Sequence, residues 1–68
     1  MQKNDDFMGR LFNELSDLSD KTKKLGAFLD TSPDIPEPQI GLLHAQYSTM
    51  KAYGAILHLR IKDLETEK

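Results

Sequence analysis

All three prolines of the chain fall within one nine-residue segment, Asp30-Thr31-Ser32-Pro33-Asp34-Ile35-Pro36-Glu37-Pro38. Proline keeps the residue before it out of the α region, so this segment is a stiff connector and not helix. On either side the chain has no helix breaker other than glycine. The prolines therefore divide the 68 residues into two segments that can each form one long helix, and a connector this short returns the second helix antiparallel to the first.

The segment after the connector carries a regular apolar pattern. Its positions step by three and four residues, as one buried helix face requires; they are Ile40, Leu43, Tyr47, Met50, Gly54, Leu57, Ile61 and Leu64. A second apolar line beside them widens the buried arc beyond what one partner helix covers; it consists of Tyr53, Ile56 and Leu59 with Ala45, Ala52 and Ala55. We predict a helix over about 38–65 that contacts more than one neighbour.

The segment before the connector has the same spacing. Asn4, Asp5 and Asp6 offer a capping side chain and negative charge at a helix start, and the apolar positions that follow are Phe7, Leu11, Leu15, Leu18, Thr22, Leu25 and Leu29. The pattern predicts a helix over about 5–29. Gly9 leaves two alternatives open, a continuous helix or a short bent N-terminal helical segment.

The predicted fold is all-α, a single helical-hairpin domain over residues 1–68 with a connector at about 30–37. In the antiparallel register Leu15 and Leu18 meet Gly54, whose missing side chain would let the two backbones approach. At the open end of the hairpin, Leu11 and Phe7 meet Leu57 and Ile61.

A chain of this size needs support beyond its own core, because a core of 68 residues rarely supplies more than about 3–5 kcal/mol. The sequence has no cysteine, which excludes disulfides and removes the usual zinc ligands. We therefore expect a symmetric homo-oligomer assembled through the side of the second helix that carries Tyr53, Ile56 and Leu59.

The net charge and the hydropathy of the chain exclude some classes of binding partner. The net charge of −2 argues against binding to duplex nucleic acid or to an anionic membrane, since there is no basic excess to release counterions. No apolar stretch approaches the roughly 18 residues of a membrane span, and no leader pattern is present. The expected setting is the cytoplasm.

The sequence has few residues that could serve in catalysis or bind a metal. His44 and His58 are fourteen residues apart in the second helix, about 21 Å along its axis, which is too far to share a metal within one chain. The serines and threonines lack a strand–turn–helix elbow, and the four glycines do not cluster into a phosphate-binding loop. We expect no metal, no cofactor and no enzymatic activity, which leaves binding.

The candidate ligand-binding residues lie in the first helix. An aromatic ring can stack on a base while arginine or lysine meets a phosphate, and Phe7, Arg10, Lys21 and Lys24 supply these groups. Three of the four have an ordinary alternative: Phe7 can be a core residue, and the two lysines can form a solvated face through pairs with Asp17 and Asp20.

Both halves of the chain resemble a known family. The resemblance covers almost the whole chain, and its most specific parts are Lys21-x-x-Lys24-Leu25-x-x-Phe28-Leu29 and Gln46-x-x-x-Met50-x-x-Tyr53-x-x-Ile56-Leu57-x-x-Arg60-Ile61. These segments are similar to the helical hairpin of phage anti-CBASS proteins of the second type, which is shared with the first type of anti-Thoeris protein. The resemblance implies a homo-hexameric sponge that sequesters, without cleavage, the cyclic di- and trinucleotide signals made by bacterial cGAS-like enzymes.

The resemblance also implies residue roles. Phe7 matches an aromatic that stacks on bases, either Lys21 or Lys24 matches a phosphate-binding lysine, and Arg60 is a candidate for a second anion contact. Where the family has tyrosine this chain has Phe7, which keeps the π-face and lacks the hydroxyl donor. The alternative interpretation is a small oligomeric helical module that binds another protein, with no nucleotide ligand.

Overall fold

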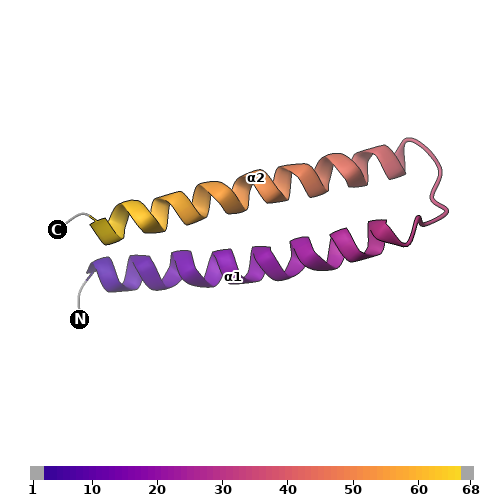
Figure 1. Cartoon of the computed structure of the whole chain (residues 1–68). Helices are drawn as coiled ribbons and strands as arrows, with labels where there is room; N and C mark the ends of the chain where they lie inside the picture. The colour runs from indigo at the N-terminus through magenta and orange to yellow at the C-terminus, as the bar shows by residue number, and fades with distance from the viewer. Residues whose placement is uncertain (1–2, 67–68) are drawn as a thin grey trace.

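The computed structural model describes residues 3–66, with side chains described from residue 7 onward. Two α-helices, α1 (Lys3–Asp30) and α2 (Gln39–Thr66), lie side by side and run in opposite directions, joined by the proline-bearing connector (Figure 1). No strand forms among the described residues. The predicted all-α helical hairpin is confirmed.

The apolar pattern of α2 is its contact surface with α1. Every described position of α2 that is at least partly buried belongs to the set that steps by three and four residues; these are Ile40, Leu43, Tyr47, Met50, Gly54, Leu57, Ile61 and Leu64. The tightest packing is near the open end of the hairpin, where Leu11 of α1 meets Leu57 and Ile61, and Leu57 is fully buried. Leu15 and Leu18 lie against Gly54, as the antiparallel register predicted.

The contact surface of α1 differs from the prediction at its first position. Met8, and not Phe7, packs against the cluster formed by Leu11, Leu57 and Ile61. Phe7 lies to one side with 41% of its surface exposed. The residue that was a candidate for the core is therefore available at the edge of the hairpin.

A separate bent segment at Gly9 is not formed, because α1 continues as helix from Lys3 through Gly9 to Asp30. Packing on both sides of the glycine accounts for this, since Met8 and Leu11 contact the same cluster on α2. Continuous burial on either side offsets the roughly 1 kcal/mol that glycine costs in a helix interior.

The closest approach involving a glycine is at Gly26 and not at Gly54. A Cβ atom at Gly26 would lie 2.9 Å from Cε1 of Tyr47, closer than real Cβ contacts allow, whereas a Cβ at Gly54 would make ordinary contacts at 3.7 Å and 4.0 Å with Leu18 and Leu15. A Cβ at Gly54 would therefore fit beside the two leucines, and the tighter contact with a glycine is that of Tyr47 with Gly26. Aromatic rings need more room than leucine side chains, so the glycine stands opposite Tyr47.

The connector begins and ends with backbone hydrogen bonds that close both helices. At the end of α1 the amides of Thr31 and Ser32 donate to the carbonyls of Phe28 and Leu29 at 3.1 Å, and Ser32 takes a left-handed φ of 53°, a common way to stop a helix. The amide of Leu42 donates to the carbonyl of Pro38 at 3.0 Å. Pro38 therefore precedes α2 as its capping residue and is not its first helical residue.

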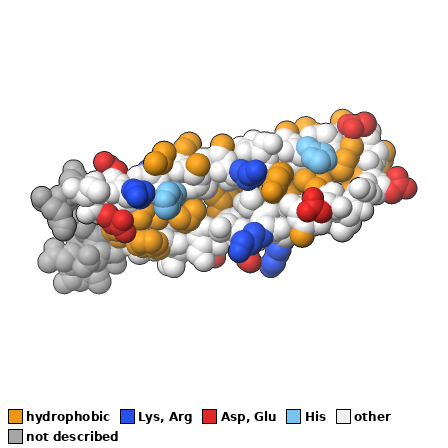
Figure 2. All heavy atoms as spheres, in the orientation of Figure 1, with side chains coloured by type: hydrophobic (Ala, Val, Ile, Leu, Met, Phe, Trp, Pro, Cys, Tyr) orange, Lys and Arg blue, Asp and Glu red, His pale blue; other side chains and the backbone are white. Residues whose placement is uncertain are grey.

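The hairpin is a rod of 49 × 16 × 16 Å. Its radius of gyration of 15.6 Å exceeds the roughly 11 Å expected of a compact domain of this length, because two helices have only one shared surface. Hydrophobic side chains reach the surface along much of the rod (Figure 2). The most exposed large ones on α2 are Leu42, Ile56 and Leu59, the last at 64%.

Candidate ligand-binding site

One side of α1 carries the polar and aromatic residues that the sequence singled out. Phe7, Arg10, Glu14 and Lys21 follow each other at intervals of three, four and seven residues, which places them on the same side of a helix. The neighbouring side of α2 contributes Tyr53 and Arg60, as the contacts below show. The buried and partly buried side chains through which α1 and α2 contact each other are called the seam below. The surface with the candidate residues runs along the edge of this seam.

At the open end of the hairpin this surface is hollowed. A depression of about 260 Å³, here called the end hollow, is lined by Phe7, Arg10, Leu11, Glu14 and Arg60. Three of the five predicted site residues, Phe7, Arg10 and Arg60, therefore lie together although Arg60 is distant in sequence. Leu11 supplies an apolar floor and anchors the hollow to the buried cluster.

Arg60 reaches across the helix pair to the ring of Phe7. Its guanidinium carbon is 5.8 Å from the ring centroid, within the range of a cation–π contact worth about 0.5–1 kcal/mol at an exposed site. The guanidinium remains at the surface, where its forked donors suit a phosphate or carboxylate. Phe7 and Arg60 thus combine a flat apolar face with a fixed positive charge.

Glu14 places a negative charge in the same hollow. The hydroxyl of Tyr53 donates a hydrogen bond to Oε2 of Glu14, and among the described residues this is the one side-chain hydrogen bond that joins the two helices. Sequence reasoning missed both groups as site residues. The spacing of Glu14 from Arg10 could have indicated Glu14, but its pairing with Tyr53 depends on the packed register.

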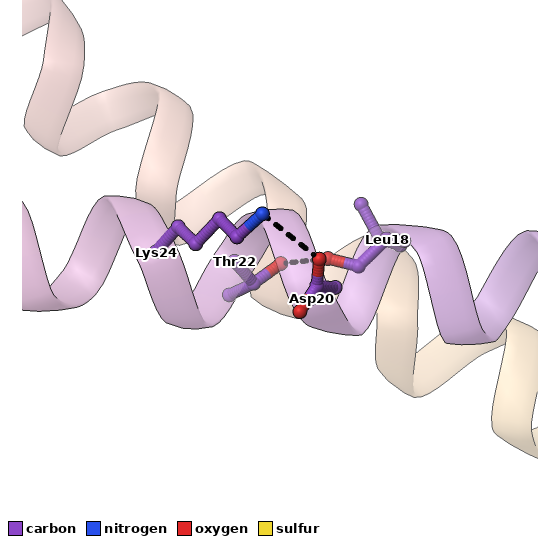
Figure 3. Close-up of polar contacts among 4 residues, drawn as sticks. All are labelled: Leu18, Asp20, Thr22 and Lys24. Carbon is purple, nitrogen blue, oxygen red and sulfur yellow. Dashed lines mark hydrogen bonds and ion pairs between the residues drawn. The ribbon is translucent and has the colours of Figure 1, made fainter.

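The two lysines lie outside the end hollow. Lys24 pairs with Asp20 at 3.2 Å within α1, and both side chains are largely exposed (Figure 3). In the same view the hydroxyl of Thr22 donates to the carbonyl of Leu18 at 2.7 Å, which satisfies the one polar side chain in the seam of α1. Lys21 is eleven residues beyond Arg10, about 16 Å along the axis.

Two larger depressions lie elsewhere on the rod. One, of about 550 Å³, runs along α1 and is lined by Phe12, Asp17, Asp20 and neighbouring residues; the other, of about 400 Å³, lies between the helices beside Lys23, Lys51 and His58. The first holds two carboxylates that would repel an anion. Neither depression brings an aromatic ring together with arginine. The end hollow is therefore the better candidate for a ligand-binding site, although it is smaller.

Other kinds of site are absent from the described part of the chain. No group of three or more histidine, cysteine, aspartate or glutamate side chains could hold a metal ion within residues 3–66. In the same range neither helix combines the length and apolar character needed to cross a bilayer.

The fold and the end hollow together define a small helical hairpin that presents an aromatic ring, two arginines and a glutamate at its open end. The chain belongs to the Sequestin family, whose model matches residues 5–63. No curated protein and no solved structure matches it. Family membership indicates a sequestering protein, which fits a site built from binding groups.

Proposed function

We propose that this protein sequesters cyclic oligonucleotide second messengers, cyclic dinucleotides and also cyclic trinucleotides, without cleaving them. In this proposal it acts in the cytoplasm of a bacterial host, where it withdraws the signals of CBASS anti-phage immunity. The observation that carries the proposal is the end hollow, where the ring of Phe7 can stack on a base while Arg10 and Arg60 meet phosphate. Membership of the Sequestin family supports retention of a ligand.

The size of the end hollow supports a site completed by a second copy of the chain. Its volume of about 260 Å³ is below the roughly 300–1,000 Å³ of typical small-molecule sites, and a cyclic dinucleotide is a large ligand. The exposed Leu42, Ile56 and Leu59 offer an apolar surface for assembly. We propose a symmetric homo-oligomer, a hexamer, in which neighbouring copies share each ligand.

The proposal is tested by thermal melting and calorimetry with cyclic di- and trinucleotides. A ligand at about 100 times its Kd adds roughly 2.7 kcal/mol to stability, which corresponds to a rise of roughly 10–20 °C in Tm for a chain of this length. The ligand recovered after denaturation should be intact. A linear product would contradict sequestration and indicate a phosphodiesterase.

Phe7→Ala should lower affinity by roughly ten- to a hundredfold, since stacking on an aromatic contributes about 1–3 kcal/mol per base. Phe12→Ala is the matched control, because Phe12 is similarly exposed on α1, at 48% against 41% for Phe7, and lies outside the end hollow. Equal losses in the two variants would show that Phe7 has no specific contact with the ligand.

Lys21 is the better candidate for the phosphate-binding lysine, because it continues the side of α1 that carries Arg10 and Glu14 while Lys24 is paired with Asp20. Lys21→Ala should reduce affinity several-fold and weaken the salt dependence of binding, whereas Lys24→Ala should do neither. Calorimetry at two salt concentrations makes the comparison. The opposite ranking would assign the phosphate contact to Lys24.

The exposed apolar side of α2 also fits a second function, a helical module that binds another protein. Leu59 and Leu42 are the most exposed large hydrophobic residues of the described chain, and such surfaces are typical of protein interfaces. If no cyclic nucleotide raises the Tm, this second function is favoured.

A further inference from the structure

A carboxylate in a site for anionic ligands requires an explanation. Glu14 lines the end hollow together with Arg10 and Arg60, and a carboxylate beside arginines ordinarily pairs with them. Within the described chain the one ion pair joins Lys24 to Asp20 instead. Glu14 is therefore ion-paired with neither arginine, and the guanidinium donors of both remain available to a phosphate.

Tyr53 holds Glu14 in this position. Its hydroxyl donates to Oε2 of Glu14 from the opposite helix, and the tyrosine ring, 40% exposed, lies at the edge of the seam. An ionised carboxylate has two oxygens and about four lone-pair directions, all of them acceptors. One hydrogen bond from Tyr53 thus orients the group and leaves most of its acceptor capacity free.

The free acceptors of Glu14 share the end hollow with the ring of Phe7. Phe7 and Glu14 line the same hollow and are seven residues apart, two turns along one side of α1. A base on the ring of Phe7 has its flat face against the aromatic and its hydrogen-bonding edge free to meet a polar group of the same hollow. With Arg10 and Arg60 on phosphate, the remaining polar side chain of the hollow is Glu14, which accepts hydrogen bonds and cannot donate them when ionised.

A carboxylate, which can only accept hydrogen bonds, interacts differently with guanine and with adenine. The Watson–Crick edge of guanine presents two adjacent donors, N1–H and the N2 amino group, which can both point at one carboxylate. The corresponding edge of adenine presents the N6 amino donor beside the N1 lone pair, and that lone pair would face the carboxylate oxygen and repel it. Glu14 therefore suits guanine and disfavours adenine.

We propose that Glu14, oriented by Tyr53, selects guanine-containing cyclic nucleotides over adenine-only ones. This inference rests on the function proposed for the same hollow and adds its ligand preference. Arg10 and Arg60 bind phosphate, Phe7 binds the face of the base, and Glu14 binds its edge.

Isothermal titration calorimetry with cyclic di-GMP and cyclic di-AMP tests the preference. The unmodified protein should bind cyclic di-GMP roughly tenfold or more tightly than cyclic di-AMP, the discrimination expected of a good bidentate contact to a base. Glu14→Gln should remove most of that ratio, because an amide presents one acceptor and one donor and can pair with adenine. Asp17→Asn is the matched control, since Asp17 is an exposed acid one turn further along α1 and lies outside the end hollow.

Tyr53→Phe tests whether Tyr53 orients Glu14 through its hydroxyl or only packs its ring between the helices. It keeps the ring and removes the hydroxyl, so the ratio of the two affinities should fall severalfold while the Tm of the free protein changes little. A ratio unchanged by both Glu14→Gln and Tyr53→Phe would overturn the inference. Equal binding of the two ligands by the unmodified protein would overturn the guanine preference and leave sequestration standing, whereas no binding of any cyclic nucleotide would overturn both.

Discussion

Single residues at the edges of the seam determine which parts of this hairpin are available for binding. Met8 occupies a partly buried position beside Leu11, and Phe7 lies at the surface within reach of Arg60. Gly26 makes room for the ring of Tyr47 in the other half of the rod. A substitution of one side chain at either place would change the packing of its neighbours more than the course of the backbone.

Gly26→Ala should destabilise the hairpin, because its Cβ would lie 2.9 Å from a ring carbon of Tyr47 and a rigid ring cannot yield as a flexible chain end does. Overpacking of this kind costs about 1–3 kcal/mol, more than the roughly 1 kcal/mol that alanine gains over glycine in a helix.

Gly54→Ala is the control for that substitution, since its Cβ meets neighbours only at 3.7 Å and 4.0 Å. It should stabilise the hairpin by about 0.5–1 kcal/mol. Urea unfolding followed by circular dichroism measures both variants. Equal stabilisation in the two would show that the Tyr47 ring moves freely.

The sequence was informative about which residues line the end hollow and less so about how they are paired. Phe7, Arg10 and Arg60 were predicted as ligand-binding residues, and the hairpin brings all three to the end hollow. The bond from Tyr53 to Glu14 joins residues 39 positions apart, and helical spacing within α1 or α2 cannot reveal such a contact. Helical spacing offered both Lys21 and Lys24 an acidic partner four residues earlier, and in the structure Lys24 pairs with Asp20.

The two helices show how well the spacing of apolar residues predicts which positions of a helix are buried. In α2 the steps of three and four residues identified all of the partly buried positions, because one continuous surface packs along the whole helix. In α1 the same rule placed Phe7 where Met8 packs. Near a helix end two adjacent residues can both reach the seam, and side-chain shape then decides which one is buried.

Gly9→Ala should stabilise α1 by about 0.5–1 kcal/mol, because the helix is continuous there and a Cβ would meet no atom within 4 Å. Chemical unfolding measures the gain, and amide exchange near residue 9 should slow. A loss of stability would contradict a continuous, uncrowded helix at Gly9. A bent state adopted only with ligand would instead leave the gain in stability and lower the ligand affinity of the same variant.

The whole molecule is a rod with more apolar surface than two helices can cover. Its fully or nearly fully buried hydrophobic residues in the described chain are Leu11, Leu57 and Ile61, a small core for 68 residues. Leu42, Ile56 and Leu59 remain exposed on α2. Assembly with further copies would bury this surface and add the stability that the isolated hairpin lacks.

Leu59→Glu should dissociate the proposed oligomer, because burying an unpaired carboxylate in an interface costs several kcal/mol. Sedimentation at micromolar concentration should give a multiple of the 7.7 kDa chain mass for the unmodified protein and a smaller species for the variant. Lys62→Glu introduces the same side chain at another exposed position of α2 and serves as control. A mass of one chain for the unmodified protein would contradict assembly.

The direction in which the hairpin folds back has a practical consequence for measuring any of these affinities. The beginning of α1 and the end of α2 lie together at one end of the rod, and the connector lies at the other, 49 Å away along the long axis (Figure 1). A purification tag or surface anchor on either terminus would crowd Phe7 and Arg60. Asp34→Cys, in a chain with no other cysteine, would place a dye or biosensor attachment at the far end and leave the end hollow open to its ligand.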